Sequence, residues 1–189
     1  MKKPLSAMGL SAALSAAVSV ALAGALLATG FAAPAAEAAS RHVVRANAAG
    51  GTTATKAVVR QGHDGGIRAR GRATATDGQG NARTVSGAST TGPNGATAVR
   101  SGEASRHADG SAERSGSFAA SGAKGSVESS GSRSKNADGS VTATRNASAT
   151  NTATGNSVQS TASYNQATGV TRSTTCYDAG GVVMNCPAR

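Results

Sequence analysis

The chain has 189 residues, a formal net charge of +10 and an aromatic content of only 2%. Every leucine lies before residue 28, and residues 39–189 contain twelve Val, one Ile and one Phe. This content is far below the level of roughly 20% under which a globular core becomes doubtful. A conventional hydrophobic core is therefore excluded after residue 38, and any order there must come from backbone hydrogen bonding in a repeated sheet.

Residues 1–38 have the composition of a secretory signal peptide. Two lysines near the start are followed by an apolar stretch, and Ala36-Glu37-Ala38 forms a small-x-small cleavage site. This pattern predicts cleavage after Ala38 and export to the periplasm, the cell surface or the extracellular space. The alternative is an uncleaved anchor, since residues 10–31 are long enough to span a bilayer.

Residues 39–72 form a strongly basic segment. Its candidate contacts for an anionic polymer are Arg41, Arg45, Lys56, Arg60, Arg68, Arg70 and Arg72. The last three alternate along the chain, so they share one face if the segment is a strand. Lipopolysaccharide, acidic polysaccharide or extracellular DNA could bind there through charge. The alternative is a face that only keeps the protein soluble.

Residues 73–175 repeat a turn signal. A glycine recurs about every fifteen residues from Gly51 to Gly169, usually in a turn-type pair such as Asp109-Gly110. Such pairs predict two-residue hairpin turns, because both central residues of those turns need positive φ. The residues between the turns alternate between small, polar and β-branched types, which predicts strands.

A second glycine column lies halfway between these turns. Its members are Gly87, Gly102, Gly116 and Gly131. Two all-β repeat architectures fit. In a meander each unit is one long strand and the midpoint glycine forms a bulge or a bend. In a small β-solenoid both columns mark corners. Because apolar residues are so few, we also expect extensive disorder in isolation.

Residues 176–189 contain the two cysteines of the chain, Cys176 and Cys186. An even cysteine count in an exported chain favours a disulfide. The turn-type sequence Ala179-Gly180-Gly181 between them predicts a disulfide-closed hairpin. Free thiols and an intermolecular bridge remain the alternatives.

The Asx-Gly repeats and the C-terminal sequence 175–183, together with Cys186, resemble uncharacterised exported Gly/Ser/Thr-rich repeat proteins of Gram-negative bacteria. The resemblance covers most of the chain after residue 38. Its motifs are of low complexity, and it implies no activity.

No motif for catalysis, cofactor binding or metal binding stands out. His42, His63 and His107 are scattered without acidic or cysteine partners at ligand spacing. We therefore expect no enzyme and no small-molecule substrate. The first hypothesis is a non-enzymatic structural or surface repeat protein of the cell envelope or extracellular matrix, with possible self-association. The alternative is a basic binding module for anionic polymers.

Overall fold

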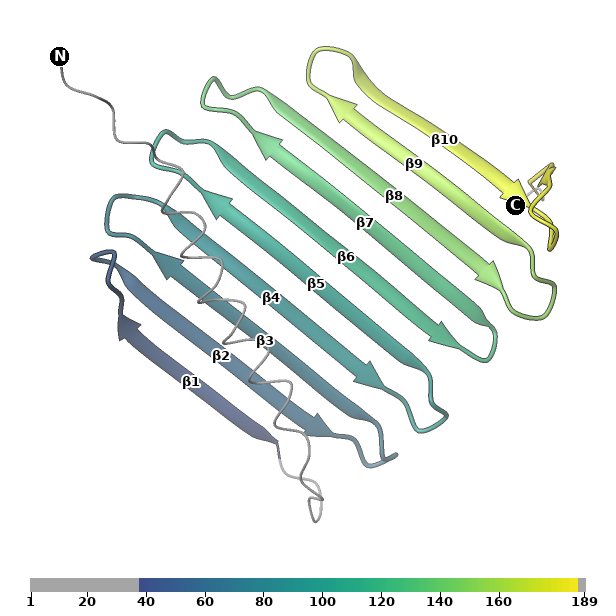
Figure 1. Cartoon of the computed structure of the whole chain (residues 1–189), viewed down its shortest axis with the longest axis horizontal. Coiled ribbons are helices and arrows are strands. Elements are labelled where there is room, and N and C mark those ends of the chain that lie inside the picture. Colours follow the sequence, from purple (N-terminus) through teal and green to yellow (C-terminus); the bar gives the residue numbers. More distant parts are fainter. Residues whose placement is uncertain (1–37, 187–189) are drawn as a thin grey trace.

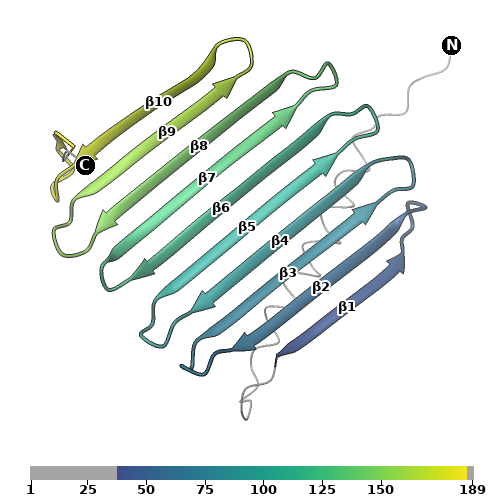
Figure 2. The same cartoon turned by 180° about the vertical axis from the view of Figure 1, so that it is seen from behind.

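The computed structural model describes residues 38–186, which form one antiparallel sheet of eleven strands in sequence order (Figures 1 and 2). The strands are β1 (Ala39–Ala46), β2 (Thr52–Gln61), β3 (Ile67–Thr76), β4 (Ala82–Thr91), β5 (Thr97–Arg106), β6 (Ala112–Gly122), β7 (Gly125–Lys135), β8 (Val141–Asn151), β9 (Ser157–Asn165), β10 (Gly169–Tyr177) and β11 (Val183–Met184). Of the two predicted architectures, the sheet is the meander. The predicted signal peptide lies outside the described residues except for Ala38.

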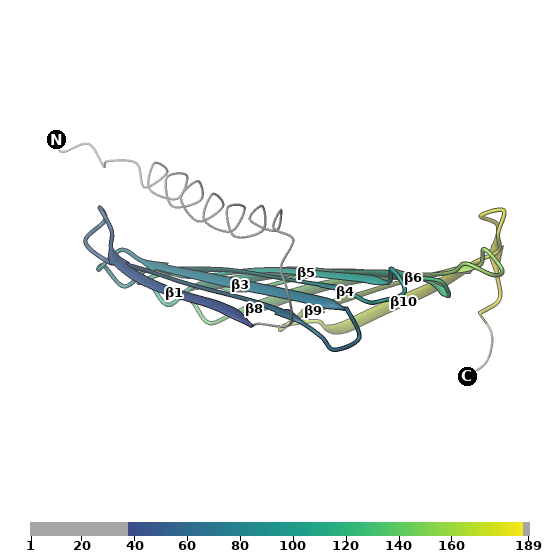
Figure 3. The same ribbon diagram turned by 90° about the horizontal axis from the view of Figure 1, so that it is seen from below.

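The sheet is a single layer (Figure 3). Within residues 38–186 the buried hydrophobic side chains are Val58, Ala73, Ala75 and Cys176, and Val85 packs against the two alanines. No helix long and apolar enough to cross a membrane occurs in this part of the chain. With so few buried side chains, the continuous backbone hydrogen-bond ladder is the main interaction that orders the strands. The expected disorder in isolation stays a prediction.

The recurring glycines lie in the turns between strands or, at Gly125 and Gly169, at the first residue of the next strand. A positive φ occurs at Gly50, Gly65, Gly78, Gly80, Gly95, Gly110, Gly125, Gly139, Gly155, Gly169 and Gly181. Glycine adopts this left-handed conformation without the steric cost of a Cβ atom. The turn positions predicted from the glycine spacing are therefore confirmed, with the first two shifted by one residue.

The type of turn differs from the prediction. Between β5 and β6, the Gly110 amide donates to the His107 carbonyl at 3.0 Å, and the His107 amide donates to the Ser111 carbonyl at 2.9 Å. This is the pattern of a three-residue loop whose last residue is a left-handed glycine. The Asp109 carboxylate accepts from the Ser111 amide at 2.8 Å, so aspartate supports the loop through its side chain. Of the connections described, only residues 123–124 form a two-residue loop.

The midpoint glycines do not form bulges. Gly102 lies opposite Gly116, and Gly116 lies opposite Gly131, with no residue skipped on either side. A glycine in a strand can mark a bulge, but here the ladder continues through it. The bulge is therefore absent at these positions, and the bend, the other form predicted for the midpoint glycines, stays a prediction.

The predicted C-terminal disulfide is confirmed. Cys176 and Cys186 are bonded, with their Cα atoms 5.3 Å apart. The bond ties the chain after β11 back to β10, where Cys176 lies opposite Met184. A disulfide is consistent with an exported protein. The boundaries expected at residues 72 and 175 fall within β3 and β10, so the sheet continues through both.

The turn conformation predicts a difference between two glycine-to-alanine substitutions. Gly110 has a φ of 85°, and a Cβ there would meet no atom within 4 Å, so Gly110→Ala adds backbone strain alone. We expect it to lower the free energy of unfolding by about 1 kcal/mol. Gly92 lies in a turn without a positive φ, and its Cβ would make an ordinary contact at 3.6 Å. Gly92→Ala should therefore cost less in urea unfolding followed by circular dichroism. Equal losses would contradict the assignment.

Candidate functional site

The pairing register assigns each strand residue to one of two faces. Residues that lie directly opposite each other on neighbouring antiparallel strands point to the same side, and successive residues along a strand alternate. One face contains the row that runs from Lys56 through Arg72, Gly102 and Gly131 to Arg145. The other face carries mainly Ser, Thr and Ala. We call the first the cationic face and the second the hydroxyl face.

The charged side chains of the strands are segregated between these faces. The cationic face carries Lys56, Arg60, Arg68, Arg70, Arg72, Arg100, Arg106, Arg114, Arg133, Lys135, Arg145 and Arg172. No strand residue on this face is acidic. The hydroxyl face carries Arg41, Arg45, Arg83, Glu103, Glu113 and Glu128. Summed over the strand residues, the cationic face has a net charge of +12 and the hydroxyl face has a net charge of zero.

From β5 to β10 every basic strand residue lies on the cationic face, even where the numbering of that face changes. From β1 to β6 the cationic face holds the even-numbered residues. The two-residue loop after β6 exchanges the faces, so this face holds odd-numbered residues in β7 and β8. The connection between β8 and β9, in which Thr150 lies opposite Ser157, restores even numbers in β9 and β10. The basic residues change parity at the same points: Arg114 is even, Arg133 and Arg145 are odd, and Arg172 is even again.

Three like-charged pairs lie directly opposite each other on this face. They are Lys56 with Arg72, Arg60 with Arg68, and Arg114 with Arg133. Like charges in such positions destabilise a sheet. All twelve basic side chains of the face are exposed. The ion pair found within residues 38–186 lies instead on the hydroxyl face, where Arg83 Nη2 contacts Glu103 Oε1 at 2.6 Å. Free positive charge is thus concentrated on one side of the sheet.

A shallow groove of about 1210 Å³ crosses the middle of the cationic face. Its floor includes Gly102, Gly116 and Gly131, which have no side chains to fill the space between their neighbours. The basic residues that line it are Arg72, Arg100, Arg114, Arg133 and Arg145. Phe118 adds an apolar surface to the lining. The groove therefore offers a broad, positively charged surface rather than an enclosed pocket.

The residues predicted to contact an anionic polymer are divided between the faces. Lys56, Arg60, Arg68, Arg70 and Arg72 lie on the cationic face, and the last three share it as predicted. Arg41 and Arg45 lie on the hydroxyl face. The sequence reasoning missed the seven basic residues of this face beyond residue 72. Their alternation within each strand, combined with the loop lengths, could have identified them.

The aspartates in the turns occupy the ends of the sheet. Hydrogen bonds from the Asn81 side chain and the Gln79 amide hold the pKa of Asp77 below its usual 3.8. The hydroxyl and amide of the serine two residues later lower the pKa of Asp109 and Asp138 in the same way. These carboxylates are therefore ionised within their own turns.

The histidines of the described residues are scattered over the sheet. His42 lies in β1, and His63 and His107 lie in turns. No group of three or more His, Cys, Asp or Glu side chains that could hold a metal ion occurs between residues 38 and 186. No protein-family model, curated protein or solved structure matches the chain. The cationic face is therefore the candidate site that the geometry itself provides.

The turn aspartates predict acid sensitivity. A carboxylate whose pKa is lowered on folding stabilises the fold above its unfolded pKa, and this stabilisation is lost as the pH falls through the folded pKa. We expect the free energy of unfolding to fall as the pH drops below 3.8, the usual value for Asp77, Asp109 and Asp138. The triple Asp→Asn variant at these positions should show a shallower fall in urea titrations at several pH values. Identical slopes would contradict this account.

Proposed function

We propose that the chain is an exported, non-enzymatic structural protein of the cell envelope or extracellular matrix that binds anionic polymers through its cationic face. The observation that carries the proposal is that twelve of the fifteen basic strand residues lie on one face, through two changes of parity. A solubilising surface needs charge but does not need that charge on one side of a sheet.

The energetics of the face favour a polyanionic partner. Directly opposed cations such as Arg114 and Arg133 repel each other. A polymer with closely spaced negative groups would neutralise this repulsion and release its own counterions. The face is also wide and open, which suits an extended polymer or surface better than a small molecule enclosed in a cleft. Lipopolysaccharide, acidic polysaccharide and extracellular DNA share the required chemistry.

The location in the proposal rests on two features. The predicted signal peptide directs the chain out of the cytoplasm. The Cys176–Cys186 disulfide is a bond that persists in oxidising compartments. Both support a periplasmic, cell-surface or extracellular protein.

Two double variants test whether the face, rather than net charge, binds the polymer. Arg114→Gln with Arg133→Gln removes two charges from the cationic face, and Arg41→Gln with Arg45→Gln removes two from the hydroxyl face. We expect the first variant to weaken binding to a short DNA duplex and to a polyuronate. Its slope of log affinity against log salt for DNA should become shallower by about 2. The second variant should leave both quantities nearly unchanged.

Equal losses in the two variants would show that net charge alone drives binding. Failure of the unchanged protein to bind either polymer at low salt would overturn the proposal. Deleting residues 39–72 is a poorer test, because it removes β1, β2 and most of β3 together with their charges.

A further inference from the structure

An apolar row crosses the cationic face near one end of the strands. Its members lie directly opposite each other on successive strands from β5 to β11: Ala98, Ala120, Val127, Ala149, Val158, Cys176 and Met184. The next row of the same face begins at Arg100 and Phe118 and ends with two hydroxyl residues, Ser160 and Thr174. In a chain with so few apolar residues after residue 38, an apolar row across seven strands is a distinct feature of this face.

The part of the row from β7 to β11 lines an open groove of about 470 Å³. The five side chains of the row that line it are Val127, Ala149, Val158, Cys176 and Met184. Val127 and Met184 remain 44% and 38% exposed. The Cys176–Cys186 disulfide ties the chain after β11 to β10, so it keeps Met184 at the end of the groove. The volume lies within the range of small-ligand sites, about 300–1,000 Å³.

The chemistry of the groove suits an alkyl chain. Across the five strands from β7 to β11 the row is about 19 Å long, because neighbouring strands lie about 4.8 Å apart. The groove is therefore long and narrow, and the side chains of the row offer an occupant no polar group. Burial of an apolar chain there would remove the exposed surface of Val127 and Met184 from water.

Positive charge lies on both sides of this row. Lys124, in the loop after β6, lines the same groove beyond the strand ends. On the other side, Arg100 lies two residues from Ala98 along β5. Arg145 and Arg172 lie about 13 Å from the row along β8 and β10, from the rise per residue. A negatively charged group at the end of an alkyl chain would therefore meet a cation on either side of the groove.

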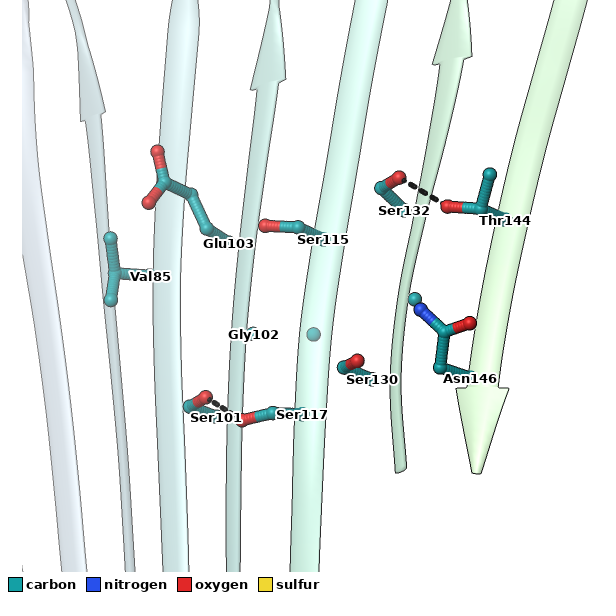
Figure 4. Close-up of a pocket in the computed structure, with 12 residues that line it drawn as sticks. Val85, Ser101, Gly102, Glu103, Ser115, Ser117, Ser130, Ser132, Thr144 and Asn146 are labelled. Carbon is teal, nitrogen blue, oxygen red and sulfur yellow. Dashed lines mark hydrogen bonds between the residues drawn. The ribbon is translucent and has the colours of Figure 1, made fainter. Parts of the chain in front are cut away.

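The hollow on the hydroxyl face has a different chemistry (Figure 4). Its lining consists mainly of serines, with Glu103 among them. Ser101 bonds to Ser117 at 2.6 Å, and Ser132 bonds to Thr144 at 3.0 Å, so these hydroxyl groups are paired with each other. Such a surface offers an alkyl chain little apolar contact. An apolar groove beside free positive charge is therefore a property of the cationic face.

We propose that this groove binds an acyl chain of a phosphorylated lipid, and that the basic side chains beside it bind the headgroup. The inference rests on the proposed function for its recognition of negative charge. It selects lipopolysaccharide among the three polymers named above, because acidic polysaccharide and DNA carry no acyl chain. Charge alone would bind all three, whereas the apolar row adds affinity for the acylated one only.

A series of alkyl phosphates from hexyl to dodecyl tests the inference, each titrated below its micelle concentration into the full chain in a calorimeter. Each methylene group that enters the groove should tighten binding by up to about four-fold. Dodecyl maltoside has the same chain as dodecyl phosphate but no charge. We expect it to bind at least about ten-fold more weakly, because it forms no charge-assisted hydrogen bonds with the basic side chains.

Two exposed valines on opposite faces give matched variants. Val127 lies in the groove, and Val99 lies on the hydroxyl face with 54% of its surface exposed. Val127→Ser should weaken the binding of dodecyl phosphate at least about four-fold and leave the affinity for a short DNA duplex unchanged. Val99→Ser should change neither. Any binding by the apolar residues 10–31 is common to both variants.

Equal dissociation constants along the series, equal effects of the two substitutions, or equally tight binding of dodecyl maltoside would overturn the inference. If the same protein still binds the DNA duplex, the inference fails and the proposed function stands. Failure to bind either the duplex or a polyuronate overturns the proposed function, whatever the alkyl series gives.

NMR of the unchanged protein keeps the test decisive if a variant fails to fold. During titration with dodecyl phosphate, the methyl signals of Val127 and Val158 should shift, and those of Val99 should stay in place. Hexyl phosphate at the same concentration should produce much smaller shifts. Equal shifts at all three valines, or no shift at any of them, would contradict binding in the groove.

Discussion

The structure depends on an unbroken antiparallel hydrogen-bond ladder in a single layer. Within residues 38–186 only four hydrophobic side chains are buried, so side-chain packing contributes little to the order of most strands. Each backbone bond adds a modest net stabilisation, but the ladder repeats it along every strand from β1 to β10. Glycines in the turns support this ladder, because each adopts a positive φ without steric strain and lets the next strand pair in register.

The same ladder determines the surface chemistry. With no interior, every strand residue belongs to one of two faces, and the side-chain period of two makes this assignment strict. An odd number of residues between two opposed strand residues preserves the parity of a face, and an even number, as between Gly122 and Gly125 or between Thr150 and Ser157, exchanges it. The basic residues follow both exchanges, after β6 and after β8. The charged strand residues on one side of the sheet are therefore all basic, while the other side has a net charge of zero and is rich in hydroxyl groups.

Part of the fold and part of the cationic face could be predicted from the sequence, and the rest could not, for physical reasons. The turn glycines and the Cys176–Cys186 hairpin depend on local signals and were predictable. Arg68, Arg70 and Arg72 were also placed on one face, because that argument needs only one strand. The full cationic face was not predictable from segment charges. To place Arg72 and Arg145 on one face, the parity across each connection must be known. The two-residue loop 123–124 differs by a single residue from the three-residue loops 108–110 and 137–139 on either side of it. The net charge of a segment does not show on which face of the sheet its basic residues lie.

Amide hydrogen exchange followed by NMR tests the central claim, that a single-layer meander ladder carries the order. The account predicts protection of successive amides through β2 to β9, since these strands have a neighbour on both sides. In the edge strand β1, alternate amides alone should be protected, namely those that point towards β2. Uniformly fast exchange with collapsed amide dispersion would contradict the account, and so would protection of every amide in β1.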